Sequence, residues 1–139
     1  MATTTERRGL ALLEPLVVAA LVGAATLLVA LRDPHVPGSY GVCPSLMIFG
    51  LACPGCGGLR ATHDLAHLDL VGAWASNPLV VVLLPAVVGL WSLWLAARWS
   101  PRRTMPTVPR VVWITVGAIA VIFGVVRNIP GAGDFLGPA

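Results

Sequence analysis

Three long runs of apolar residues place the strongest constraint on how this 139-residue chain folds. They lie at about residues 10–31, 79–97 and 109–127. Because an α-helix rises about 1.5 Å per residue, roughly 20 residues cross the hydrocarbon core of a bilayer. The third run is the shortest, so we expect Arg110 and Arg127 at its ends to extend toward the two membrane surfaces. The pattern predicts an all-α integral membrane protein with three transmembrane helices in one membrane domain, residues 1–139.

The composition excludes a soluble globular protein. Hydrophobic residues make up 57% of the chain and charged residues only 11%, which is too few charges to cover a water-exposed surface. The lipid bilayer is therefore the first expected partner. A membrane protein or a second copy of this chain is the next, because Ala19-x-x-x-Gly23 and Ala120-x-x-x-Gly124 offer small residues for close helix packing. No nucleic-acid partner is expected.

The distribution of arginines predicts which side of the membrane each segment occupies. All nine basic residues are arginine. Six lie at the N-terminus or between the second and third spans: Arg7, Arg8, Arg98, Arg102, Arg103 and Arg110. The other three are Arg32, Arg60 and Arg127. Basic residues concentrate on the cytoplasmic side of membrane proteins. We therefore expect the N-terminus inside, and the segment 32–78 and the C-terminus outside.

All three cysteines lie in this extracytoplasmic segment. Cys43-Pro44 precedes an apolar stretch, Ser45 to Leu51, that is too short to span a bilayer. We expect it to form a short re-entrant or interfacial helical element. The sequence Cys53-Pro54-Gly55-Cys56-Gly57-Gly58 predicts a turn, after which a helical pattern resumes. Asn77-Pro78 predicts the start of the second span, with Asn as the cap and Pro in the first turn.

The cysteines allow three kinds of chemistry. As a structural cluster, two of Cys43, Cys53 and Cys56 form a disulfide, and spacing alone does not choose the pair. In thiol-disulfide exchange, Cys53 attacks because a helix N-terminus favours its thiolate, Cys56 resolves, and Arg60 stabilises the thiolate. As a metal site, the three cysteines and His63 supply a Cys₃His set for zinc, which is the one candidate cofactor.

The helix that follows the cysteine turn carries a polar face. Arg60, His63, Asp64 and His67 fall at positions i, i+3, i+4 and i+7, so they share one side of the helix. We expect this side to face outward or toward the cysteine turn. Arg60 and Asp64 have the spacing of an ion pair, and His63 and His67 have a spacing at which two histidines can bind a metal.

Several of these residues form a combined pattern: Cys43-Pro44, Cys53-Pro54-Gly55-Cys56-Gly57, Arg60-Ala61, Asp69 and Asn77-Pro78. At this pattern the chain resembles a family of small bacterial membrane proteins that is described only as a domain of unknown function. The resemblance covers about residues 40–85. It implies a multi-span protein of the bacterial cytoplasmic membrane without an established activity, and it adds Asp69 and Asn77 to the candidate site residues.

These observations favour a non-enzymatic accessory or assembly protein with a structural extracytoplasmic cysteine cluster. A membrane thiol-disulfide oxidoreductase that uses Cys53 and Cys56 is the first alternative. A membrane protein that binds zinc or another metal is the second. Motifs for nucleotide binding, for a serine nucleophile and for a zinc protease are absent from the sequence.

Overall fold

The computed structural model describes residues 4–41, 43–100 and 107–131. Six helices follow one another in these ranges: α1 Thr4–Leu31, α2 Pro44–Phe49, α3 Gly58–Ala66, α4 Leu70–Ser76, α5 Pro78–Trp99 and α6 Arg110–Arg127. The described part of the chain contains no strand. The predicted all-α fold class is therefore confirmed.

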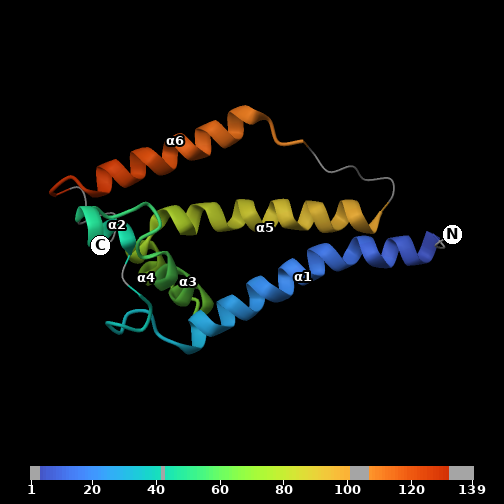
Figure 1. Ribbon diagram of the computed structural model, residues 1–139, viewed down its shortest axis with the longest axis horizontal. Coiled ribbons are helices and arrows are strands. Elements are labelled where there is room, and N and C mark those ends of the chain that lie inside the picture. The colour runs from blue at the N-terminus through green and yellow to red at the C-terminus, as the bar shows by residue number, and fades with distance from the viewer. Residues whose placement is uncertain (1–3, 42, 101–106, 132–139) are drawn as a thin grey trace.

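Three of the helices are long and apolar enough to cross a membrane. Their apolar windows are Leu12–Leu31, Pro78–Trp99 and Arg110–Arg127, with mean hydropathies of 2.3, 2.4 and 1.9. These windows agree with the three predicted spans. Figure 1 shows that α1, α5 and α6 alternate in direction, with α2, α3 and α4 gathered at the end opposite the N-terminus. The chain therefore has a long helical part and, at one end, a compact group of short helices.

Two polar contacts join the N-terminal half of α1 to the C-terminal half of α5. The indole Nε1 of Trp91 donates a hydrogen bond to the carbonyl oxygen of Pro15 at 3.2 Å. Further from the short helices, Arg98 Nη2 lies 2.8 Å from Glu14 Oε2. Helix α6 stands apart from this pair in Figure 1 and approaches the rest of the chain at its C-terminal end. The short helices thus sit where all three long helices meet.

The short apolar element that the sequence predicts at residues 45–51 is found as α2. Cys43 precedes the helix, Pro44 occupies its first turn, and Gly50 ends it with φ of 64°. The side chains of Met47, Ile48 and Phe49 are 72%, 70% and 71% exposed. A short helix that presents three large apolar side chains is suited to the boundary between lipid and headgroups.

The sequence predicts that the polar face of α3 is directed outward or toward the cysteine turn, but part of this face packs against α4 instead. Asp64 is only 7% exposed and accepts a hydrogen bond from Ser76 Oγ at 2.9 Å. The chain reverses after α3 through Leu68, which has a positive φ of 63°, and α4 then folds back over this side of α3. Asp64 consequently pairs across the two helices, and the expected ion pair with Arg60 is not among the salt bridges of the described residues.

Gly57 occupies a position at the start of α3 where a side chain does not fit. Its φ is 77°, and a Cβ placed on it would overlap the backbone oxygen of Ser76. This close approach brings the cysteine turn against the junction of α4 and α5.

We predict that Gly57→Ala lowers the stability of the protein, by about 1–3 kcal/mol from the backbone conformation alone. Gly55→Ala is the matched control, because its Cβ would meet only Cys53 Sγ at an ordinary 3.8 Å. Thermal loss of the helical circular dichroism signal in detergent measures both variants. Equal midpoints for the two variants would contradict the close approach at Gly57.

Candidate functional site

The side chain of Asn77 holds the cysteine turn against the start of α5. Its Nδ2 donates two hydrogen bonds, each of 3.0 Å, to the carbonyl oxygens of Pro54 and Cys56. Its Oδ1 accepts from the backbone N–H of Val80 at 3.2 Å and so caps the helix. Asn77 is 0% exposed. Both amide protons and the amide oxygen are therefore used, and the predicted cap has a second task that the sequence did not indicate.

The C-terminal end of α6 holds the same turn from another direction. Arg127 Nη1 donates to the carbonyl oxygen of Cys56 at 2.6 Å. Asn128 exchanges two hydrogen bonds with the backbone of Ala52, at 2.8 and 2.9 Å. Gly124 packs on Pro54, whose Cδ lies 3.1 Å from the position of an added Cβ. The turn is thus fixed from two long helices that are distant in the sequence.

Arg127 differs from its expected position. The length of the third span suggested that this side chain extends toward the membrane surface, but it is only 5% exposed. The carbonyl oxygen of Cys56 supplies an acceptor within the protein, so the guanidinium turns inward. A buried arginine is stabilised when such acceptors replace its hydrogen bonds to water.

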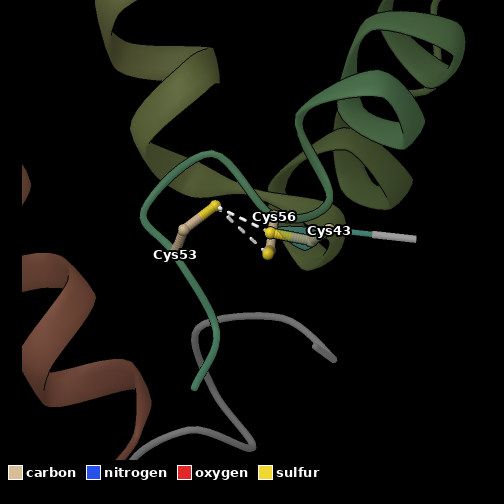
Figure 2. A group of neighbouring side chains, drawn as sticks. All are labelled: Cys43, Cys53 and Cys56. Carbon is tan, nitrogen blue, oxygen red and sulfur yellow. Dashed lines mark hydrogen bonds between the residues drawn. The ribbon is translucent and has the colours of Figure 1, made fainter. Parts of the chain in front are cut away.

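The three cysteines converge within this frame. Cys53 Sγ lies 3.3 Å from Cys56 Sγ and 3.5 Å from Cys43 Sγ. All three sulfur atoms lie within 4.8 Å of one another, and all three residues are free thiols. Figure 2 shows the Cys53 sulfur directed at the other two. Cys43 reaches the group from the residue before α2, ten positions along the chain from Cys53.

The pKa values of the Cys43 and Cys56 thiols are shifted in opposite directions. The pKa of Cys43 is lowered to about 7, mainly because the backbone N–H of Leu46 hydrogen-bonds to its sulfur and also because the thiols of Cys56 and Cys53 do so. The pKa of Cys56 is raised to about 12, mainly by burial and then by its hydrogen bonds to Cys53 and Cys43. The lowered pKa makes Cys43 a further candidate for the reactive thiolate, beside the Cys53 that the sequence predicts.

A cavity of about 520 Å³ lies beside the thiols. Its walls include the three cysteines, Arg60 from the first turn of α3 and His35 from the loop after α1. Arg60 therefore lines the same cavity as the three cysteines. The sequence predicts Arg60 beside these cysteines. A small ion or molecule in this cavity is within reach of thiol, guanidinium and imidazole groups.

His63 does not join the cysteines but belongs to a second cluster. It lies with Asp33 and His35, and their ligand atoms are within 4.8 Å of one another. Sequence reasoning did not single out Asp33 or His35. The signal available to it was the Asp-x-His spacing directly after the first span, in a chain with only three histidines.

The remaining predicted residues have structural positions around these two clusters. Asp69 caps α4 by accepting from the backbone N–H of Gly72 at 2.8 Å. His67 follows the last residue of α3, and its Nδ1 lies 2.9 Å from the carbonyl oxygen of His63. Asp64 bonds to Ser76 and faces His35.

Comparison with known proteins gives one result that bears on this segment. Residues 43–91 match the family described as "Protein of unknown function (DUF2752)". The matched segment begins at Cys43 and ends within α5, so it contains the three cysteines and Asn77. The resemblance to an unknown-function family is confirmed. No curated protein and no solved structure matches the chain.

A pair of matched substitutions separates the two roles of Asn77. Asn77→Asp retains the oxygen that caps α5 but places a carboxylate against the carbonyl oxygens of Pro54 and Cys56. We expect a loss of about 1–3 kcal/mol for each buried group left without its partner. Asp69→Asn is the control, because Asp69 caps α4 through Gly72 and not through the cysteine turn. We expect its free energy of unfolding to stay within about 0.5 kcal/mol of the wild type. Chemical or thermal unfolding in detergent measures both, and equal effects would contradict the second role of Asn77.

The acidity of the thiols predicts an order of alkylation. In the reduced, metal-free protein, Cys43 should react with iodoacetamide before Cys56, with a half-maximal rate near pH 7, because only the thiolate attacks. Cys56 should stay nearly unreactive until the protein unfolds. Peptide mass spectrometry at a series of pH values measures each site, and the denatured chain supplies the control in which all sites react. Faster labelling of Cys56 than of Cys43 would contradict the assignment.

Proposed function

We propose that the protein is a non-enzymatic membrane accessory protein that binds a thiophilic metal ion, such as zinc, through Cys43, Cys53 and Cys56. The observation that carries the proposal is the convergence of three sulfur atoms from two separate segments, with neighbouring separations of 3.3 and 3.5 Å. Zn–S bonds of about 2.3 Å in tetrahedral geometry place sulfur ligands about 3.8 Å apart. Small movements of the side chains bring the thiols to that spacing.

The fixed backbone of the turn supports this assignment. Asn77, Arg127 and Asn128 fix the carbonyl groups of residues 52, 54 and 56. The backbone that carries Cys53 and Cys56 is therefore ordered before a metal binds. Such preorganisation favours metal affinity, because little conformational entropy remains to be lost on binding.

Charge in the cavity also supports the assignment. Three thiolates and one divalent ion carry a net charge of −1, and Arg60 on the cavity wall offsets it. A set of three protein ligands leaves one position of a tetrahedral ion open toward the cavity. A water molecule or a donor group from a partner membrane protein fits that position.

The arginine distribution supports a location in the bacterial cytoplasmic membrane with the thiols outside. Arg7 and Arg8 lie near the start of α1 and Arg98 lies in the last turn of α5, so these basic residues gather at the end of the helices away from the cysteines (Figure 1). The positive-inside rule then gives an extracytoplasmic thiol cluster. Metal binding also protects thiols from oxidation in that compartment.

Thiol-disulfide exchange is the second candidate, and the lowered pKa of Cys43 favours it. The Cys43 thiolate would attack one sulfur of a partner's disulfide and release the other sulfur as a thiolate. The Cys53 thiolate, 3.5 Å away, would then attack the mixed disulfide. The chain would end with a Cys43–Cys53 disulfide, and the partner's disulfide would be reduced to two thiols. In this scheme Cys43, rather than Cys53, is the attacking residue.

Thiol protection distinguishes the two candidates in the detergent-purified full chain. We expect Zn²⁺ to protect all three cysteines from alkylation, and a chelator to remove the protection. Cys53→Ser should lose the protection of Cys43 and Cys56, whereas His63→Ala should retain it, because His63 lies in the other cluster.

Two outcomes would contradict metal binding at the thiols. Two cysteines that resist alkylation until a reductant is added would indicate a disulfide and support exchange. Three cysteines that react at the same rate with and without Zn²⁺ would exclude the metal site.

A further inference from the structure

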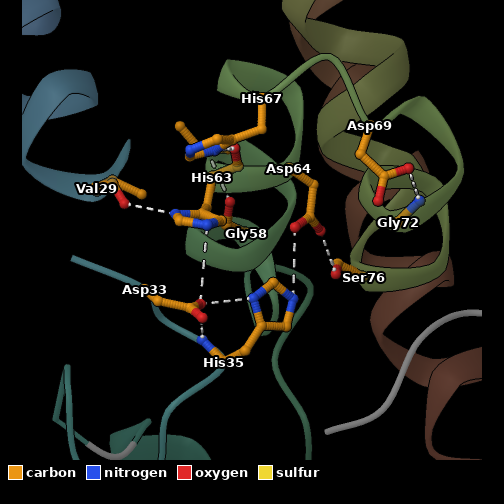
Figure 3. Close-up of polar contacts among 11 residues, drawn as sticks. Val29, Asp33, His35, Gly58, His63, Asp64, His67, Asp69, Gly72 and Ser76 are labelled. Atoms are coloured by element: carbon orange, nitrogen blue, oxygen red, sulfur yellow. Dashed lines mark hydrogen bonds and ion pairs between the residues drawn. The ribbon is translucent and has the colours of Figure 1, made fainter. Parts of the chain in front are cut away.

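We infer that Asp33, His35 and His63 form a second metal site, one with nitrogen and oxygen ligands for a divalent ion such as Zn²⁺. Asp33 Oδ1 lies 2.9 Å from His35 Nδ1 and 3.9 Å from His63 Nε2. One ligand atom from each residue lies within 4.8 Å of the others. Figure 3 shows both rings directed at the Asp33 carboxylate, His35 from the same loop and His63 from α3.

Each imidazole has its other nitrogen next to an oxygen of the protein. His63 Nδ1 lies 2.8 Å from the carbonyl oxygen of Val29 at the end of α1. His35 Nε2 lies 3.5 Å from Asp64 Oδ1. Histidines that bind metals commonly donate their second N–H to a carbonyl or carboxylate, which fixes the ring and leaves one nitrogen free for the ion. His63 has this arrangement, and the second nitrogen of His35 faces the Asp64 carboxylate at the longer distance of 3.5 Å.

The position of Asp64 gives an independent reason for a cation here. This carboxylate is 7% exposed and accepts from Ser76 Oγ, which neutralises none of its charge. Among the described residues its ion-pair partner is His35, while the carboxylate of Asp69 lies on the other side of it, beside Gly72. Asp33 and Asp64 together carry a charge of −2, which a divalent ion bound between Asp33 and the two histidines balances. A buried carboxylate is stabilised by such a charge nearby.

The second site differs from the thiol site in chemistry and shares its surroundings. Imidazole and carboxylate ligands suit borderline and harder ions, whereas three thiolates prefer softer ones. His35 lines the same cavity as the three cysteines. His35 thus lies between the two sites, which have different metal preferences, and the histidine site does not depend on whether the thiols bind a metal.

Without a metal, the same geometry describes a His35 side chain held between the carboxylates of Asp33 and Asp64. This alternative makes the cluster an ion-pair network between the loop after α1 and the α3–α4 pair. It requires no metal, so replacing His63 would not change the number of metal ions bound per chain. Metal titration therefore separates the two interpretations.

The experiment is a Co²⁺ titration of the full chain, purified in detergent without a histidine tag. Cobalt bound to thiolates gives an intense sulfur-to-metal charge-transfer band, whereas cobalt bound to nitrogen and oxygen gives only weaker visible bands. We expect two bound cobalt ions per chain. His63→Ala and Asp33→Asn should each lose one ion without loss of the charge-transfer band. Asp64→Asn should weaken this site by roughly 10- to 100-fold, because Asp64 orients His35.

His67→Ala is the matched control, since His67 lies 4.3 Å from His63 between ring centroids but is outside the cluster. It should retain both ions. Asp33→Asn keeps an oxygen that accepts from the His35 backbone N–H, so it guards against misfolding of the alanine variants. Unchanged stoichiometry in His63→Ala and Asp33→Asn would overturn the site. A wild-type chain that binds cobalt without a charge-transfer band would instead overturn the thiol site.

Discussion

The buried carboxamide of Asn77 is the interaction on which the arrangement of this protein depends. One side chain caps the longest apolar span and binds two carbonyl oxygens of the cysteine turn. Its burial makes these bonds important, because carbonyl groups left without partners at such a depth are costly. The turn therefore has one position relative to α5, and the thiols of Cys53 and Cys56 are set by it.

Helix α6 also holds the cysteine turn, although few of its own side chains are buried. Most of its side chains are exposed, as expected for a helix that contacts lipid. Its last residues nevertheless reach the cysteine turn through Arg127 and Asn128. The family-matched segment, residues 43–91, thus depends on a part of the chain outside the match. Metal binding at the thiols would in turn stabilise the contact between α6 and the rest of the protein.

The sequence predicted what local patterns determine and missed what depends on tertiary contacts. Long apolar runs determine the three spans, and Asn77-Pro78 determines the start of α5, so both were predicted. The inward turn of Arg127 was not predicted, because nothing near it in the sequence reveals the Cys56 carbonyl. The separation of His63 from the cysteines was also missed, since helical spacing placed it correctly on α3 but could not show that the loop after α1 supplies Asp33 and His35.

Cadmium NMR of the cadmium-loaded full chain tests the central claim most directly, because the resonance of a cadmium ion moves far downfield as the number of thiolate ligands rises. Our account predicts one resonance in the region of three-sulfur coordination, from Cys43, Cys53 and Cys56, and its loss in Cys53→Ser. A chain that gives no resonance downfield of the nitrogen and oxygen region would contradict a metal site at the thiols.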